Sequence, residues 1–545
     1  MILLRWSSPG SSCRADEPPL VNGLEGGNAL ASAPPVSLAS SVGDVWEWKD
    51  SGRNMHILLT SLLLAPSLLA YVVPPFAGAR AGPVRRVHRR ASLPCASATS
   101  LAGFDEFVRT NPRSDRFDVD RFHHVEFYCA DAQCTAGRFA HALGMDVLAA
   151  SGPQSGNHIF SSVVIGSGDV RFCFTAPLQP PLDSGEVGAS PPTTGAVESG
   201  LADAVGFDAD AARRFIAKHG GVAVRSVGLL VADADAAYTS CLEGGGEGVL
   251  APRALPGGAG GRLAEVRLYG DAVLRFVELD HAAYDGALFP GYVDAVPHVA
   301  RSDGGSASAA DGTYGIRRID HVVGNVWEMM PTIERLRGMT GFHDFAEFTS
   351  EDVGTIDSGL NSMVLANNKQ NVLLPVNEPT YGTRRRSQIE TYLVSHGGEG
   401  VQHIALFTDD IFHTIRQMRA AGRRGGFQLM DRPSDEYYEE LPGRIGDGLS
   451  ADDLATAREL GLLVDRDPEG VLIQVFTRPV GDRPTLFLEI IQRVGCMVDD
   501  ATRPGGGQVQ RGGCGGFGKG NFKELFKSVE AYERSLEGGS DAPQK

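Results

Sequence analysis

An acidic residue stands inside an otherwise apolar segment near the end of the chain. The segment TLFLEIIQR, residues 485–493, places Glu489 among leucine, isoleucine and phenylalanine side chains. If this segment is a β-strand, its side chains alternate between two faces, and both faces are apolar. An unpaired carboxylate buried in such a strand would be costly and would take up a proton. Glu489 therefore either meets a cation or lies on an edge strand, where its carboxylate reaches solvent.

Two histidines supply the rest of a candidate metal-binding set. His321 and His403 each lie in a short apolar run. Two neutral imidazoles and one carboxylate on one face of a metal leave the opposite face open, which is the ligand set of non-haem Fe(II) oxygenases. The alternative is that each histidine is a hydrogen-bonded core residue, and spacing alone does not separate the two interpretations. A repeat in the chain favours the metal site, because it places both histidines at one equivalent position.

That repeat consists of four segments, each with a short apolar strand, a turn and an amphipathic helix. The segments begin at Phe122, Val224, Ile319 and Val401. Aligned by eye, they place four residues at the same strand position: His124, Ser226, His321 and His403. Further β-rich runs follow each segment and close at residues 170–177, 274–280, 371–379 and 485–493. The pattern predicts an α+β protein of four βαβββ-type modules, paired into two half-barrel domains.

The first pair of modules lacks the complete ligand set. His123 and His124 open the first module, but its closing run contains no acid. The second module has Glu278 in its closing run but Ser226 where a histidine would be needed. We therefore expect the first half to be a structural duplicate without a metal, in which His123 and His124 are core or surface residues.

Composition excludes some classes of function. The chain has 545 residues and a formal net charge of −17, which argues against a nucleic-acid partner. A local positive site on such a protein could still bind a small anion. The eight cysteines include no CxxC pair, and this usage is typical of a reduced compartment, where cysteines are mostly small core residues.

The first hundred residues differ from the rest. Residues 56–73 form an apolar run that Pro66 interrupts, and residues 76–100 contain five arginines and no acidic residue. This order indicates a cleaved two-part leader over residues 55–100, with a start at Met55 and a plastid as destination. One alternative to the leader is a membrane anchor, and another is a misassigned start, so that residues 1–54 are not part of the protein. The alternative to a plastid location is the cytoplasm. The expected organisation is a targeting or disordered extension (1–103), a module pair without metal (104–300) and a catalytic module pair (301–545).

The chain ends in a candidate lid. After the glycine-rich segment GGCGGFGKG, residues 512–520, the side chains of Phe522, Leu525, Phe526 and Val529 fall on one face of a helix. Such a stripe usually packs into a core. Because the helix follows a glycine hinge, it could also close over a site and exclude water.

Several segments resemble one enzyme family. IDHVVGNV, RRRSQIETYL, GVQHIALFTDDI, GVLIQVFTRPVGDRPTLFLEIIQR and GGCGGFGKGNFKELFKSVE are similar to the plant and algal branch of 4-hydroxyphenylpyruvate dioxygenase, which has the vicinal oxygen chelate fold. The resemblance implies that His321, His403 and Glu489 bind one Fe(II) per chain and carry the catalysis. It also implies a substrate pocket made by Ser362, Asn377, Gln388, Gln402, Gln474, Phe476, Phe487, Phe517 and Phe522. Alternation agrees for Gln474 and Phe476, which are two residues apart and so share a face.

The same resemblance implies the reaction and the partners. The enzyme would convert 4-hydroxyphenylpyruvate and O2 to homogentisate and CO2, in tyrosine and phenylalanine catabolism and as a precursor step for plastoquinone and tocopherol. It would form a homodimer, and its mature form would have no stable membrane association. Two alternatives stay open: a 4-hydroxymandelate synthase, which uses the same substrate and metal, and a non-catalytic ligand-binding member of the fold.

Overall fold

The computed structural model describes residues 49–50, 53–54, 107–178, 200–258, 261–280, 284–295, 313–353, 359–382, 384–499 and 508–536. The chain divides into two units, residues 1–94 and 95–545. In the first unit, the described residues form the short strands β1 (Lys49–Asp50) and β2 (Arg53–Asn54), which pair antiparallel. The expected leader over residues 55–100 lies outside the described residues.

Four modules follow one another along the second unit. The first consists of β3 (Val119–Cys129), α1 (Ala132–Leu143), β4 (Asp146–Ser151), β5 (Phe160–Ser167) and β6 (Val170–Pro177). The second consists of β7 (Val222–Val231), α4 (Ala234–Glu243), β8 (Gly248–Ala254), β9 (Arg262–Tyr269) and β10 (Ala272–Glu278). The third consists of β12 (Ile316–Asn325), α5 (Met329–Thr340), β13 (His343–Phe348), β14 (Leu360–Ala366) and β15 (Leu373–Pro379). The fourth consists of β16 (Gly400–Thr408), α8 (Ile411–Gly422), β17 (Leu463–Arg466), β18 (Gly470–Phe476) and β19 (Phe487–Gly495). The predicted α+β class and βαβββ modules are confirmed.

Shorter elements connect or cover the modules. In the first half these are η1 (Pro153–Ser155), α2 (Gly200–Ala204), α3 (Ala209–Lys218), η2 (Pro256–Gly258) and β11 (Val293–Asp294). In the second half they are α6 (Ser350–Val353), α7 (Gln388–His396), α9 (Asp435–Ile445), α10 (Ala451–Glu459), β20 (Met497–Asp499), β21 (Gln508–Gln510), η4 (Lys519–Asn521) and α11 (Phe522–Leu536). Among the described helices, none is both long and apolar enough to cross a membrane.

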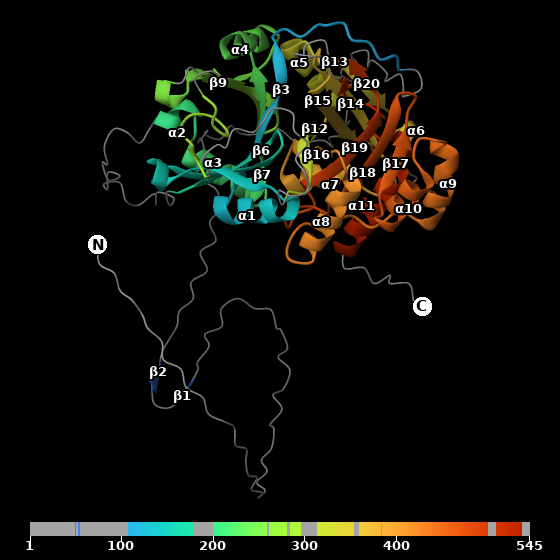
Figure 1. Cartoon of the computed structure of the whole chain (residues 1–545). Coiled ribbons are helices and arrows are strands. Elements are labelled where there is room, and N and C mark those ends of the chain that lie inside the picture. Colours follow the sequence, from blue (N-terminus) through green and yellow to red (C-terminus); the bar gives the residue numbers. More distant parts are fainter. Residues whose placement is uncertain are drawn as a thin grey trace, which may run out of the picture. The chain divides into compact units, whose positions relative to one another are not determined.

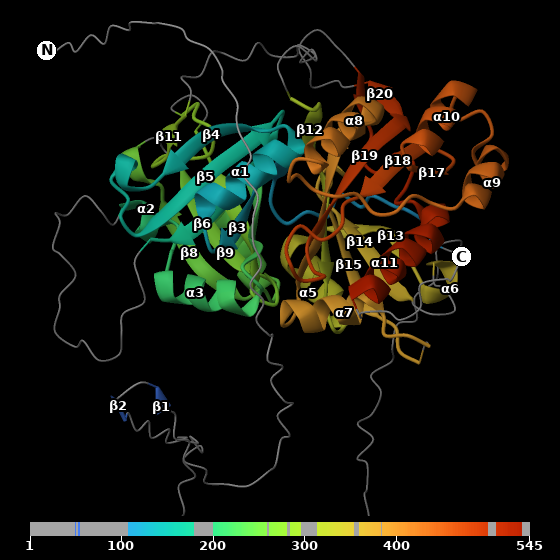
Figure 2. The same cartoon turned by 90° about the horizontal axis from the view of Figure 1, so that it is seen from below.

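Each pair of modules shares one curled sheet (Figures 1 and 2). The first sheet has the strand order β11-β4-β5-β6-β3-β7-β10-β9-β8, and the second has the order β13-β14-β15-β12-β16-β19-β18-β17. At the centre of each sheet the opening strands of two modules pair antiparallel, β3 with β7 and β12 with β16. This arrangement places equivalent positions of two modules on neighbouring strands.

Local sequence explains where the module helices begin. Asp131, Asp233 and Asp410 follow the opening strands of three modules, and each carboxylate accepts a hydrogen bond from a main-chain N–H in the first turn of α1, α4 or α8. Such N-caps each contribute about 1 kcal/mol to helix stability. The helices then pack across the two halves, α1 against α8 and α4 against α5. One hydrophobic cluster consequently runs through both module pairs.

The strand register confirms the equivalence read from the repeat. In the second sheet, His321 and His403 each pair with the residue two positions after the other histidine. His124 and Ser226 have the same relation in the first sheet. The four residues therefore occupy one structural position.

A β-bulge precedes each of these positions. The extra, unpaired residues are His123, Arg225, Asp320 and Gln402. A bulge interrupts the alternation of a strand, so the bulged residue and its neighbour can turn toward the same side. In the second sheet this brings Asp320 beside the ring of His321 and Gln402 beside the ring of His403.

In the first sheet an arginine stands where the second sheet has Glu489. Arg275 on β10 has the same register relative to β7 that Glu489 on β19 has relative to β16. Glu278, the acid in the closing run of the second module, therefore does not occupy the position of Glu489. Glu278 lies three positions further along β10 and accepts a hydrogen bond of 3.0 Å from the main-chain N–H of Ala234, at the start of α4.

Arg275 supplies a fixed cation inside the first sheet. Its side chain is 2% exposed and lies 2.7 Å from carboxylate oxygens of both Glu126 and Glu265. Its Nη1 lies 3.1 Å from Nε2 of His124. Burial, followed by the charges of His123 and Arg275, holds the pKa of His124 well below its usual value, so the imidazole is neutral.

The disulfide between Cys496 and Cys514 departs from the expected cysteine chemistry. The two Cα atoms are 5.8 Å apart, and the cysteines are 18 residues apart in sequence. No sequence motif indicates this pair, because Cys496 follows β19 and Cys514 lies in the glycine-rich loop, and these two segments come together only in the folded chain. Four other described cysteines are free, and three of them are buried.

Replacing Arg275 should test its role as an internal counter-charge. Arg275→Met would leave Glu126 and Glu265 buried without a cation, and we expect a loss of about 3–5 kcal/mol in the free energy of unfolding by urea. The control is Arg262→Met, which removes a partly exposed partner of Asp235 and should cost under about 1 kcal/mol. Equal, small losses in the two variants would contradict this role.

Candidate metal centre

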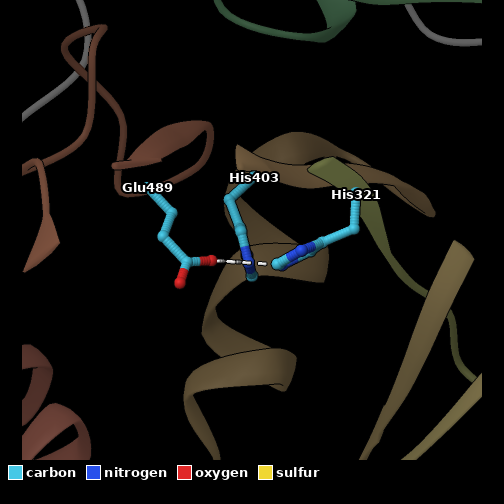
Figure 3. Close-up of side chains that lie close together, drawn as sticks. All are labelled: His321, His403 and Glu489. Atoms are coloured by element: carbon cyan, nitrogen blue, oxygen red, sulfur yellow. Dashed lines mark ion pairs between the residues drawn. The ribbon is translucent and has the colours of Figure 1, made fainter. Parts of the chain in front are cut away.

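Three side chains from adjacent strands, His321 and Glu489 buried and His403 half-buried, converge inside the second sheet (Figure 3). His321 comes from β12, His403 from β16 and Glu489 from β19. One Glu489 carboxylate oxygen lies 3.1 Å from Nε2 of His321 and 3.4 Å from Nε2 of His403. One ligand atom from each of the three residues lies within 4.8 Å of the other two, so the set could hold a single ion.

Glu489 is not on an edge strand. β19 is hydrogen-bonded to β16 on one side and to β18 on the other, and Glu489 is 3% exposed. The edge-strand interpretation therefore does not apply, and the carboxylate faces the two imidazoles inside the sheet.

The pKa values show how this cluster distributes charge. Burial opposes ionisation of Glu489, but the charge and hydrogen bonds of the two histidines outweigh it and lower its pKa to about 2. Burial also opposes a charged His321, yet Glu489 and Asp320 together raise the pKa of this imidazole. For His403 burial prevails and lowers the pKa. In the metal-free cluster, His321 is therefore the imidazole that takes a proton first.

The second nitrogen of each imidazole is held by an acceptor. Nδ1 of His321 donates to Oδ1 of Asp320 at 2.9 Å, and Nδ1 of His403 donates to Oε1 of Gln402 at 3.0 Å. With a proton on each Nδ1, the neutral rings direct the lone pairs of both Nε2 atoms toward Glu489. This tautomer and this outer support are what metal-binding histidines require. The donor set therefore fits a divalent transition metal.

One cavity adjoins the three residues, and every residue of the expected substrate pocket lines it. These residues are Ser362 on β14, Asn377 on β15, Gln388 on α7, Gln402 on β16, Gln474 and Phe476 on β18, Phe487 on β19, and Phe517 and Phe522 near α11. Among the lining residues that the structure describes, Glu489 is the only acid, and lysine and arginine are absent.

Aromatic rings form much of the cavity wall. The ring of His403 stacks on Phe487 with a centroid distance of 4.8 Å, and Phe476 lies 6.0 Å from both rings. Phe517 meets the ring of His321 edge-on at 5.3 Å. Such walls exclude water, which strengthens every electrostatic interaction in the cavity.

Gln474 brings an unpaired polar atom to this wall. Its side chain is 3% exposed, and its Oε1 has no hydrogen-bond partner within the described residues. A Cβ at Gly518 would lie 2.5 Å from that oxygen, and Gly518 has a φ of +76°, a left-handed conformation that favours glycine. A buried acceptor without a partner is costly, and a bound hydroxyl group would satisfy it.

Helix α11 covers the cavity. Phe522 and Leu525 line it, and Phe526 is buried in a cluster that includes Phe345 and Phe348. Figure 2 shows α11 beside β13 to β15. The apolar face predicted for this helix is therefore packed, and part of it faces the cavity rather than the core.

Sequence reasoning missed two buried residues behind the site. Asp320 supports His321, and Arg493 on β19 contacts Asp320 through hydrogen bonds of 3.0 and 2.7 Å. Simple alternation would place Asp320 on the face opposite His321, and only the bulge reverses this. Arg493 closes the segment from which the argument on Glu489 began, but no local pattern indicates its partners.

Fold and site together define a class of protein. Paired βαβββ modules that share one curled half-barrel sheet are the architecture of the vicinal oxygen chelate fold. A solved structure of a triple mutant of 4-hydroxymandelate synthase from Streptomyces coelicolor shares this fold, with a TM-score of 0.56 and 24% sequence identity. That alignment covers 76% of this chain and 99% of the other. A scan against protein-family models finds no match.

Curated relatives identify the family. A protein named 4-hydroxyphenylpyruvate dioxygenase from Daucus carota is 52% identical over 437 residues, which cover 80% of this chain and 92% of the relative. Proteins of the same name from Arabidopsis thaliana and Hordeum vulgare are 49% and 52% identical, and each alignment covers 80% of this chain and 93% of the relative. The chain belongs to the 4-hydroxyphenylpyruvate dioxygenase family.

The charge of Glu489 should be necessary for metal binding. Glu489→Gln keeps the shape of the side chain but removes its charge, and we expect the affinity for Fe(II) in anaerobic equilibrium dialysis to fall by at least about 100-fold. His124→Ala is the control, because His124 occupies the equivalent position in the first sheet. Metal stoichiometry should be unchanged in the folded control. Stoichiometric iron in the Gln variant, or iron loss in folded His124→Ala, would contradict the assignment.

Metal affinity should also depend on pH. Glu489 stays ionised down to about pH 2, so the competing proton is the one on His321, whose pKa is raised. Below that pKa, each unit of pH should lower the apparent affinity by about ten-fold, with release of one proton per metal bound. In the metal-free protein, the stabilisation from this proton is present at low pH and is lost as pH rises through the folded-state pKa. An affinity that does not change across about pH 5 to 8 would be inconsistent with this histidine as a ligand.

Proposed function

We propose that this protein is an Fe(II)-dependent dioxygenase that converts 4-hydroxyphenylpyruvate and O2 to homogentisate and CO2. One observation carries the proposal: His321, His403 and Glu489 meet at the wall of a cavity lined by all nine expected pocket residues. The names of relatives that are 49% to 52% identical support the substrate.

His321, His403 and Glu489 would hold one ferrous ion per chain. When bound, the ion would supply a Lewis-acidic, redox-active centre with open positions for a chelating 2-oxo acid and for O2, which a 2-His-1-carboxylate set allows. The chain would contribute the neutral tautomers of the two imidazoles, through Asp320 and Gln402, and the dry aromatic wall.

The cavity's charge explains why the metal would govern substrate binding. Its described lining contains the carboxylate of Glu489 but no lysine or arginine. In the metal-free protein, an anionic 2-oxo acid would therefore meet no net positive charge, because any proton on His321 is already paired with Glu489. With a ferrous ion, two neutral imidazoles and one carboxylate, the net charge becomes about +1, which favours the anion.

The polar and aromatic side chains would orient the substrate. Phe476 and Phe522 are proposed to stack on its ring, with Phe487 and Phe517 along the cavity wall. The unpaired Oε1 of Gln474 suits the phenolic O–H, which can donate to it. The other amides and the hydroxyl, Ser362, Asn377, Gln388 and Gln402, would complete the polar lining without titrating.

Product and setting complete the proposal. The plant relatives favour homogentisate over 4-hydroxymandelate, and turnover over mere binding. Homogentisate would then serve tyrosine and phenylalanine breakdown, or plastoquinone and tocopherol synthesis. We further propose a homodimer, tested by light scattering, and a plastid location, tested by N-terminal peptide mass spectrometry of the native protein.

An oxygen-uptake assay with product analysis tests the activity. With Fe(II) and 4-hydroxyphenylpyruvate, and without 2-oxoglutarate, one O2 should be consumed and one CO2 and one homogentisate formed per substrate. Mass spectrometry that finds 4-hydroxymandelate would make the protein a synthase of that acid. If the iron-loaded protein consumes no oxygen, the protein is a non-catalytic ligand-binding member of the fold.

Substrate binding should require the metal. Isothermal titration with 4-hydroxyphenylpyruvate should give no measurable heat for metal-free protein, because the cavity then offers no net positive charge to the substrate carboxylate. Protein loaded with Co(II) under argon should bind the same compound. Equal affinity with and without metal would show that another group, not the metal, neutralises the substrate.

A further inference from the structure

Arg493 connects the metal site to the glycine-rich loop in front of α11. Its side chain is fully buried, and it lies four residues after Glu489 on β19. Nε and Nη2 donate to the two carboxylate oxygens of Asp320 at 3.0 and 2.7 Å. On its other side, Nη1 donates to the main-chain carbonyls of Cys514 and Gly516, at 2.7 Å for Gly516. One rigid guanidinium thus contacts both structures.

Asp320 extends this connection to a candidate metal ligand. The same Oδ1 that accepts from Arg493 also accepts from Nδ1 of His321. Because the guanidinium is planar and binds both carboxylate oxygens, it fixes the plane of the carboxylate as well as its position. The carboxylate in turn fixes the orientation of the His321 ring.

Arg493 and the Cys496–Cys514 disulfide both hold this loop against the end of β19. Gly513, Gly515, Gly516 and Gly518 all have positive φ, and glycine-rich backbone loses more entropy on ordering than other chain does. Phe517, in this loop, lies 5.7 Å from the guanidinium carbon and 5.3 Å from the ring of His321. A displacement of the loop would therefore also displace Phe517, which forms part of the cavity wall, and the start of α11.

We propose that Arg493 is a positioning residue that couples metal binding to closure of the cavity by the glycine-rich loop and α11. This inference rests on the metal site of the proposed function. A bound metal fixes the ring of His321, which in turn fixes Asp320 and the guanidinium of Arg493. That guanidinium donates to the two loop carbonyls, of Cys514 and Gly516. By linkage, an ordered loop raises metal affinity by the same factor. The metal-free protein would then have a looser wall through which a metal can enter, and the loaded protein a closed one.

Hydrogen exchange of the full chain, with and without Co(II), measures this coupling. In the unsubstituted protein, Co(II) should slow exchange in residues 508–536 by about ten-fold or more. Arg493→Lys keeps a cation for Asp320, but one ammonium group cannot also reach both loop carbonyls. In this variant the loop should exchange at the same rate with and without Co(II), and Co(II) affinity should fall by about the factor of protection lost.

Arg444→Lys is the matched control. Arg444 donates to Oδ1 of Asn521 at 3.2 Å, beside the start of α11, and to the carbonyl of Val464, but it has no contact with Asp320. Its replacement should speed exchange in the loop in both states while the protection by Co(II) remains. Asp320→Asn is a second test from the metal side, and it should abolish the protection as Arg493→Lys does.

Three results would overturn the inference. Co(II) that binds with no effect on loop exchange in the unsubstituted protein would exclude coupling. Full protection in Arg493→Lys or in Asp320→Asn would assign it to other residues. Equal loss of protection in Arg444→Lys would make Arg493 an ordinary stabilising residue. A protein that binds no Co(II), judged by its d–d absorption, would instead refute the metal site itself.

Discussion

The carboxylate of Glu489 lies on a central strand, between β16 and β18, where water barely reaches it. Removing such a charge from water is costly unless a positive group takes the place of water. The cluster around it contains two imidazoles whose outer nitrogens are already hydrogen-bonded to Asp320 and Gln402, so the positive group must be a proton on His321 or a metal ion. What they leave is a set of lone pairs aimed at one point, next to an aromatic cavity. The charge at the cavity wall in this half follows from that arrangement.

The two sheets meet the same constraint in different ways. In the first sheet a guanidinium, Arg275, stands at the position of Glu489 and neutralises two buried glutamates. That cation is covalently part of the chain and fills its space. In the second sheet the corresponding charge is a carboxylate, which calls for an exchangeable cation with an open coordination face. In the duplicated module pairs, one structural position is therefore filled by a guanidinium in the first half and is suited to metal binding in the second half.

Much of this could be predicted from sequence because it depends on short-range patterns. The apolar strand around Glu489, the equivalent positions of His321 and His403, and the apolar face of α11 are all periodic features. The residues that could not be predicted depend on register or on distant contacts. A single bulge turns Asp320 to the side of His321, and Arg493 finds its partners in a loop some twenty residues later. The Cys496–Cys514 disulfide and the role of Arg275 were hidden for the same reason.

The most direct measurement is anomalous diffraction at the iron edge from crystals loaded anaerobically with Fe(II). We expect one peak per chain, in direct contact with Nε2 of His321, Nε2 of His403 and a carboxylate oxygen of Glu489. A peak elsewhere in the chain, or one of these three side chains turned away from the iron, would contradict the account.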